Sequence, residues 1–393
     1  MDSMPVDADD ETGPEAAEKP EAAEKADPPL AGGVAPADFR KVGIHPGHWY
    51  PVAWSRELKP GKAMAVEFAG QPIVLVRPQR DAASTEVFAL ENRCAHRQVP
   101  LDAGVVTGCG IRCHYHGWTY DREGACTSVP YLGKGKLPNG VRAYPCREAA
   151  GLILIFPGDP ALATARPFPT LGEAANPAYK TRRFGREVAC HYSFMHENLM
   201  DMNHQFMHRR LMGQIRPRYL GRRVGDDWLE VQYTFARTGG AQPWGEVAIF
   251  GGKRDRSVND RDLMTIRTAY PYQTLTIVPA GGTEAVFDLW ICYTPQDREQ
   301  KRIRTFGLIN IQRPKNLLGR AALQLAWPVL VLFTEAIFRE DRWVVEAEQR
   351  AHNAQGANWN QEVFPVIREL GALLARNGLP PEIPVGYSAA TVR

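Results

Sequence analysis

The sequence lacks several features that would place it in common protein classes. It has no G-x-G-x-x-G segment after a strand and no flavin motif, so a dinucleotide-binding domain is not indicated. Its seven cysteines are an odd number spread over 393 residues, which excludes a secreted disulfide framework and favours reduced thiols or metal ligands. The N-terminus has no apolar run and no Arg-rich segment, so no targeting signal is indicated and we expect a cytoplasmic protein.

The net charge of +3 conceals an asymmetry along the chain. Residues 1–38 hold eleven Asp and Glu but only Lys19 and Lys25, which gives this tail about −9 and the remainder about +12. The tail has almost no large apolar side chains, so we expect it to be disordered. The basic remainder favours an acidic protein partner or a membrane surface. Nucleic acid is disfavoured, because the arginines are scattered without an aromatic-interleaved motif.

The rest of the chain divides by pattern into two domains. Residues 39–160 predict a small all-β domain, because short alternating segments such as AMAVEFAGQPIVLVR and GLILIF are separated by turn residues. Residues 161–393 predict an α+β domain, in which strands between Trp228 and Gln312 form an antiparallel sheet. A helix around His196–His208 precedes these strands, and a longer helix over Leu317–Ala354 follows them.

Two mixed Cys–His pairs lie in the first domain. Cys94 and His96 form one pair, Cys113 and His116 form the other, and sixteen residues separate them. Structural zinc sites usually pair Cys with Cys and His with His, so zinc is the less favoured alternative. Two thiolates on one iron and two imidazoles on the other make a His₂Cys₂ iron–sulfur centre. The spacing Cys-x-His-x₁₆-Cys-x₂-His resembles that of the Rieske [2Fe–2S] domain, which implies one such cluster per subunit.

A second constellation lies in the segment HENLMDMNHQFMHRR. On a continuous helix, Asp201, His204 and His208 would project within about 60° of one another, so the two imidazoles could chelate one metal ion. Two imidazoles and one carboxylate with open positions form the facial triad of non-heme Fe(II) oxygenases. For the carboxylate we favour Asp341 on the buried face of the late helix, with Glu348 as the second choice.

The order Asn198-x₂-Asp201-x₂-His204-x₃-His208, followed by a late acidic helix, resembles the oxygenase (α) subunit of the Rieske non-heme iron ring-hydroxylating oxygenases. The resemblance implies a Rieske domain followed by a helix-grip-like antiparallel sheet with helices that carry a mononuclear Fe(II). It implies a homotrimer in which Asp201 bridges the cluster of one subunit and the iron of the next.

This resemblance also implies a function and partners. We expect O₂-dependent hydroxylation, mono- or dioxygenation, or oxidative demethylation of a hydrophobic substrate, aromatic, polycyclic or terpenoid. Electrons would come from a ferredoxin or an NAD(P)H-dependent flavin reductase, or from both in series. Two alternatives stay open: a Rieske electron-transfer protein with a non-catalytic second domain, and an enzyme with zinc at both sites.

One apolar stretch raises the question of membrane contact. Ala321–Phe338 is eighteen residues long and mostly apolar, but Gln324, Pro328 and Glu335 interrupt it. We therefore favour a helix of the protein core over a membrane segment. Membrane contact would make a bulky lipophilic substrate more plausible.

Overall fold

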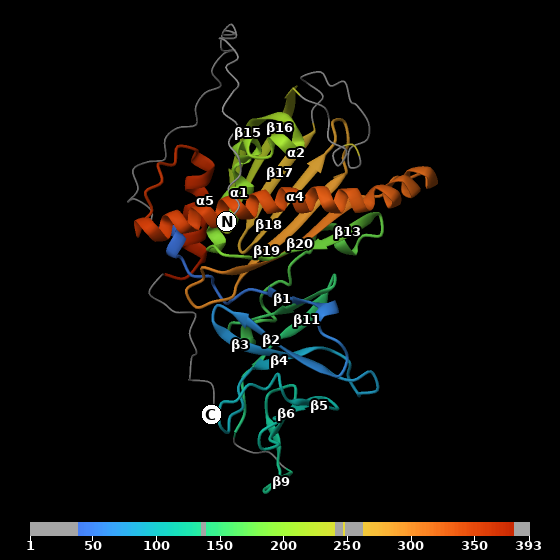
Figure 1. The fold of residues 1–393 in the computed structure, drawn as a ribbon, viewed down its shortest axis with the longest axis vertical. Coiled ribbons are helices and arrows are strands. Elements are labelled where there is room, and N and C mark those ends of the chain that lie inside the picture. The colour runs from blue at the N-terminus through green and yellow to red at the C-terminus, as the bar shows by residue number, and fades with distance from the viewer. Residues whose placement is uncertain (1–37, 135–138, 240–246, 248–261, 381–393) are drawn as a thin grey trace. The chain divides into compact units, whose positions relative to one another are not determined.

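The computed structural model describes residues 38–134, 139–239, 247 and 262–380. The predicted disordered tail, residues 1–38, lies outside the described residues apart from Asp38. The fold combines a group of small antiparallel sheets, built by residues 50–155, with one large antiparallel sheet and its helices, built by residues 179–377 (Figure 1).

The first region contains three sheets. A three-stranded sheet has the order β1 (Tyr50–Trp54), β12 (Leu152–Ile155) and β11 (Cys146–Ala149). A four-stranded sheet has the order β10 (Ala143–Tyr144), β4 (Phe88–Glu91), β3 (Gln71–Arg77) and β2 (Lys62–Phe68). A five-stranded sheet follows chain order: β5 (Val105–Thr107), β6 (Gly110–Arg112), β7 (Thr119–Tyr120), β8 (Cys126–Val129) and β9 (Gly133–Lys134).

The second region is a single eight-stranded antiparallel sheet. Its order is β13 (Tyr179–Phe184), β20 (Ile303–Gln312), β19 (Phe287–Pro295), β18 (Tyr272–Val278), β17 (Leu263–Ala269), β16 (Trp228–Gly239) and β15 (Gln214–Val224), and β14 (Glu187–Val188) also pairs with β20. The α-helices described are α1 (Tyr192–Met200), α2 (Arg209–Met212), α4 (Leu317–Gln355) and α5 (Pro365–Asn377). The short 3-10 helices are η1 (Phe39–Lys41), η2 (Ser55–Glu57), η3 (Pro160–Leu162), η4 (Gly172–Ala175) and η5 (Met202–Phe206).

The two regions share one hydrophobic core. Trp54 at the end of β1 packs on Phe306 of β20 with ring centroids 5.4 Å apart, and both side chains are buried. The Thr294 hydroxyl donates a hydrogen bond to the Pro51 carbonyl at 2.8 Å. A second, smaller core lies under the Cys–His loops and contains Cys94, Cys113 and other buried residues. The loops therefore rest on a packed base of their own.

The helix α4 forms as predicted, but its predicted burial is wrong for the first half. In Figure 1 it runs across the strands of the large sheet. Its most apolar 18-residue stretch is only 17% buried, so Ala321–Phe338 is not a core helix over its whole length. Leu323, Leu330 and Phe338 are buried in the core, and Trp327 packs against it, whereas Leu325, Val329 and Leu332 on the other side of the helix are exposed. Among the described residues, α4 alone is long and apolar enough to cross a membrane.

Candidate functional site

The two Cys–His loops are tight turns of the same kind. The amide of Gln98 donates to the carbonyl of Cys94 at 2.9 Å, and the amide of Gly117 donates to the carbonyl of Cys113 at 3.1 Å. Gly117 has φ +74°, and a β-carbon there would lie 2.9 Å from the Pro130 ring, so the turn after His116 requires glycine. Each loop thus folds its Cys and its His toward a common point.

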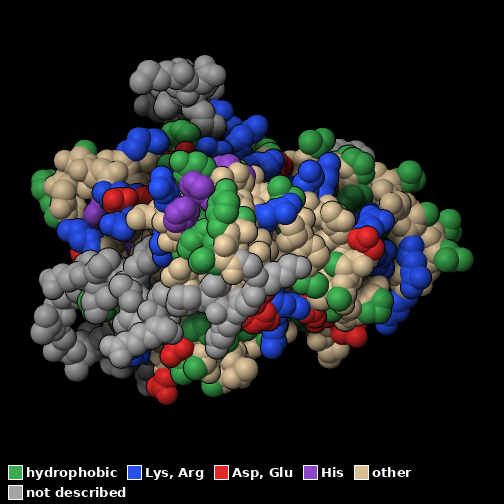
Figure 2. All heavy atoms as spheres, turned by 90° about the horizontal axis from the view of Figure 1, so that it is seen from below, with side chains coloured by type: hydrophobic (Ala, Val, Ile, Leu, Met, Phe, Trp, Pro, Cys, Tyr) green, Lys and Arg blue, Asp and Glu red, His purple; other side chains and the backbone are tan. Residues whose placement is uncertain are grey.

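The thiols and imidazoles lie on different sides of that point. Cys94 and Cys113 are buried, and burial together with the neighbouring Cys94 thiol raises the pKa of the Cys113 thiol. The rings of His96 and His116 lie 4.5 Å apart, and His96 stacks parallel on Trp118. Two sulfurs inside and two imidazoles outside match the donor set of a His₂Cys₂ [2Fe–2S] cluster. Figure 2 shows histidine side chains on the surface of this end, among Lys and Arg side chains.

A tyrosine that the sequence did not single out contacts the sulfur side. The Tyr120 hydroxyl lies 3.2 Å from Cys94 Sγ and accepts the amide hydrogen of Ala95 at 3.0 Å. Because burial raises the pKa of Tyr120, its hydroxyl stays protonated, and its hydrogen is free to point at the sulfur.

The second constellation also comes together, but through a different local structure. The predicted continuous helix over His196–His208 is wrong, because α1 ends at Met200 and Asp201 is extended, with φ −92° and ψ 99°. The Asp201 carboxylate accepts the Asn203 amide at 2.9 Å and thereby caps η5. Because of this break, the side chains of His204, which lies in η5, and of His208, the residue before α2, both line the pocket.

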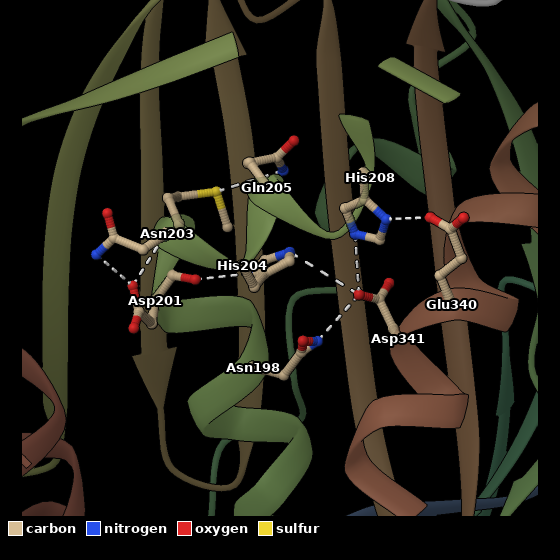
Figure 3. A network of polar contacts seen from close by, with 9 residues as sticks. Asn198, Asp201, Asn203, His204, Gln205, His208, Glu340 and Asp341 are labelled. Atoms are coloured by element: carbon tan, nitrogen blue, oxygen red, sulfur yellow. Dashed lines mark hydrogen bonds and ion pairs between the residues drawn. The ribbon is translucent and has the colours of Figure 1, made fainter. Parts of the chain in front are cut away.

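The ligand atoms of His204, His208 and Asp341 all lie within 4.8 Å of one another. Asp341 Oδ1 is 3.1 Å from His208 Nε2 and 3.8 Å from His204 Nε2, and Figure 3 shows the three side chains converging from η5, from the residue before α2 and from α4. Asn198 of α1 donates to the same Asp341 oxygen at 3.0 Å. Two imidazoles and one carboxylate in this arrangement match the donor set of a mononuclear Fe(II) site.

Hydrogen bonds to the far side of each ring orient the imidazoles. The Nδ1 of His204 lies 2.5 Å from the carbonyl oxygen of Asp201, which can only accept, so Nδ1 carries the proton and Nε2 keeps its lone pair. The Nδ1 of His208 lies 2.7 Å from the carboxylate of Glu340. Both Nε2 atoms therefore face Asp341 as metal ligands would.

The pKa shifts of the two histidines have opposite directions. Burial lowers the pKa of His204 and keeps the ring neutral, the form that binds metal. Burial also lowers the pKa of His208, but hydrogen bonds to Asp341 and Glu340 outweigh it, and the net shift is upward. A cation held next to His208 would replace that proton.

The structure overturns one alternative at this site and adds contacts that the sequence did not indicate. Glu348, the second choice for the carboxylate, is exposed and does not belong to the cluster. Glu340 was missed, because helical periodicity turns it about 100° away from its neighbour Asp341. Glu340 still contacts His208, because the imidazole ring lies between the two acids. Its Nδ1 faces Glu340 and its Nε2 faces Asp341. The Asp201 carboxylate hydrogen-bonds Asn203, and only its backbone carbonyl contacts a proposed ligand histidine.

The cluster lies in the wall of an apolar pocket. Strands β17, β18 and β19 form one side of it, with Met264, Leu275, Ile277, Phe287, Leu289 and Ile291. Helix α4 forms another side with Phe333, Ile337 and Phe338. Among the described residues, no Lys or Arg lines this pocket. A bound molecule would therefore meet hydrocarbon on most sides and the three ligands at one point.

Comparison with known proteins identifies the family. The family model "Rieske [2Fe-2S] domain" matches residues 48–145, and "Vanillate O-demethylase oxygenase C-terminal domain" matches residues 188–366. A 4beta-methylsterol monooxygenase of Methylococcus capsulatus is 34% identical over 324 residues, which cover 79% of this chain and 82% of that protein. The chain belongs to the Rieske-type non-heme iron oxygenases.

Other matches agree with this assignment. The oxygenase component of dicamba O-demethylase from Stenotrophomonas maltophilia is 38% identical over 164 residues, 41% of this chain and 47% of that protein. The crystal structure of dicamba monooxygenase bound to dicamba has the same fold, with a TM-score of 0.66 and 24% identity, and the match covers 86% of this chain and 98% of that one. As a Rieske oxygenase, the protein carries a [2Fe–2S] cluster and a mononuclear iron. The two alternatives, an electron carrier and an enzyme with zinc at both sites, find no support.

We predict that Tyr120→Phe lowers the reduction potential of the cluster. The substitution removes a hydrogen bond that stabilises the more negative, reduced sulfur ligand, and one bond of about 1 kcal/mol corresponds to tens of millivolts for a one-electron couple. A redox titration followed by electron paramagnetic resonance measures the shift. An unchanged potential would show that the hydroxyl does not donate to Cys94.

We predict that Glu340→Gln weakens iron binding at the mononuclear site roughly 10- to 100-fold, because the amide orients His208 less firmly than a carboxylate does. Competition with a chelator, read as iron per chain, measures the affinity. The native protein should hold about three irons and two acid-labile sulfides, and the variant should approach two irons with the cluster spectrum intact. Glu348→Gln, a matched change on the exposed side of the same helix, should leave all three irons in place.

Proposed function

We propose that this protein hydroxylates or oxidatively demethylates an uncharged, lipophilic polycyclic substrate with O₂, as the oxygenase component of a multi-protein system. The observation that carries the proposal is the convergence of His204, His208 and Asp341 on the wall of an apolar pocket. The reaction type agrees with relatives named monooxygenase and O-demethylase.

The pocket lining supports the substrate class. An aromatic carboxylate buried there would need a cationic partner, because an unpaired charge is costly in an apolar site. The described lining offers no Lys or Arg, and the polar groups apart from the three ligands are few: Asn198, Gln205, Thr334 and Tyr293. One relative is named for a 4beta-methylsterol, a molecule of this uncharged polycyclic kind. We therefore favour a sterol- or terpenoid-like substrate over an aromatic acid.

The protein's own groups would hold and shape the iron site. His204, His208 and Asp341 would bind the iron, whose role when bound is to reduce O₂ with electrons from the cluster. Glu340 and the Asp201 carbonyl fix the two rings through Nδ1, and Asn198 fixes the carboxylate. The apolar wall would exclude water and hold a substrate next to the three ligand residues.

The electron path and assembly form part of the same proposal. We propose a homotrimer in which the Cys94/His96/Cys113/His116 cluster of one subunit reduces the iron of its neighbour through Asp201. A ferredoxin or an NAD(P)H-dependent flavin reductase, or both, would supply the electrons. The seven cysteines form no disulfide, which fits a reducing cytoplasm. We place the domain boundaries at 39–160 and 161–393, after an acidic tail over 1–38.

Oxygen consumption tests the substrate class. With a compatible reductase and NAD(P)H, we expect substrate-dependent O₂ uptake and a hydroxylated or demethylated product with neutral sterols or terpenoids. Aromatic carboxylates such as dicamba should give rates at least tenfold lower, because the described lining has no cation to pair with the carboxylate. Mass spectrometry of the product after incubation under ¹⁸O₂ confirms the oxygen source. A preference for the aromatic acids would contradict the proposal.

Asp201→Asn tests the path between subunits. The amide keeps the side-chain oxygen that caps η5, so we expect both metals and the fold to remain. Turnover should fall by at least 100-fold, because a neutral amide does not hold a partner imidazole as a carboxylate does. Single-turnover oxidation of the reduced cluster, followed optically, should slow by the same factor. Loss of iron from the variant would instead make Asp201 a structural residue of the metal site.

A further inference from the structure

The first half of α4 carries an exposed apolar stripe that the proposed reaction does not use. At 100° per residue, its members lie within about 80° of Leu325 on one side of the helix and extend over about 22 Å. All of them are exposed in the structure: Leu317, Leu318, Ala321, Ala322, Leu325, Pro328, Val329 and Leu332. Leu325 is 81% exposed and Leu332 71%, values far above those of a core helix. A contiguous apolar face of this kind marks a binding surface.

The opposite side of the same segment is firmly held. Leu323 and Leu330 are buried in the core. The Lys180 ammonium of β13 lies 4.0 Å from the centre of the Trp327 ring. Past the C-terminal end of the stripe, Glu335 forms an ion pair of 2.7 Å with Arg182 of β13. The stripe is therefore the outer face of a fixed helix, whose exposure follows from its place in the fold.

Basic side chains border the stripe at both ends. Arg313, Lys315 and Arg320 are exposed at its N-terminal end. Arg339 and Arg342 are exposed where the stripe ends toward the iron site, beside the exposed Trp343. Of the nearby acids, Glu335 is paired with Arg182 and Arg186, and Glu346 forms an ion pair of 2.9 Å with Arg342. The border thus has a net positive charge.

This charge pattern distinguishes between two occupants. A second copy packed through the stripe would bring cationic ends together in either a parallel or an antiparallel orientation, and like charges in contact are unfavourable. An anionic lipid surface satisfies both features, because its acyl chains accept the leucines and its headgroups attract Lys and Arg. A helix with an apolar face, a basic border and an aromatic residue is typical of helices that lie in the membrane interface.

We propose that the stripe Leu317–Leu332 docks this oxygenase on anionic phospholipid membranes, with α4 lying parallel to the surface. The same helix lines the pocket through Phe333, Ile337 and Phe338, so docking sets the substrate pocket beside the lipid phase. The docking itself does not depend on the metals or on the proposed reaction.

Vesicle flotation of the full-length, metal-loaded protein tests the proposal. We expect the native protein to float with vesicles of phosphatidylcholine and phosphatidylglycerol, and to float less with pure phosphatidylcholine or at high salt. Leu325→Glu combined with Leu332→Glu should reduce the floated fraction at least tenfold, with an unchanged cluster spectrum because both side chains are exposed. Val363→Glu, the same change at a residue that is 82% exposed but lies outside α4, should float like the native protein.

Either of two results would overturn the proposal. One is a native protein that does not float. The other is a double variant that floats as well as the native protein; if its particle mass by light scattering is also lower, the stripe is a contact between copies. Flotation requires no turnover, so a failed oxygen-uptake assay would not affect the conclusion on membrane binding. A failed flotation assay would likewise not affect the proposed reaction.

Discussion

The structure depends on keeping one carboxylate beside two imidazoles inside an apolar wall. Asp341 is mostly shielded from water and faces His204 and His208, in a pocket that otherwise offers hydrocarbon. An arrangement of ionisable groups like this is costly without a cation to share. The break after α1, the carbonyl of Asp201 and the acid Glu340 all fix the two rings in this position. Metal binding is thus the condition under which this part of the fold is at its most stable.

The sides of helix α4 have three different surroundings. One side contacts the core through Leu323 and Leu330, a second turns Phe338 and Asp341 into the pocket, and a third exposes the apolar stripe. The surface that would contact lipid and the carboxylate that would bind iron lie on the same helix. Their positions relative to each other are therefore fixed. A lipophilic substrate and a lipid-facing entrance are then consistent features of one enzyme, since such molecules partition into membranes.

The sequence predicted the large features because they rest on strong local patterns. Apolar patterning located the strands between Trp228 and Gln312, where β16 begins and β20 ends. The two Cys–His pairs needed only spacing, since each pair lies on one tight turn. Asp341 could be selected over the other acids of its helix because its neighbours on the helical wheel are apolar. The donor sets follow from these patterns, while the roles of the individual residues stay predictions.

The features that escaped prediction depend on contacts distant in sequence or on the surroundings of a face. A helical wheel assumes a continuous helix, but Asp201 ends α1 and caps η5 through Asn203. Glu340 became relevant only when His208 was placed beside it by another part of the chain. The burial of Ala321–Phe338 was mistaken for a related reason. An apolar sequence pattern predicts that a helix face avoids water, but it does not distinguish a face covered by protein from a face covered by lipid. The packing of α4 against β13 is needed to see that one side of the helix is buried in the core and the other side is exposed.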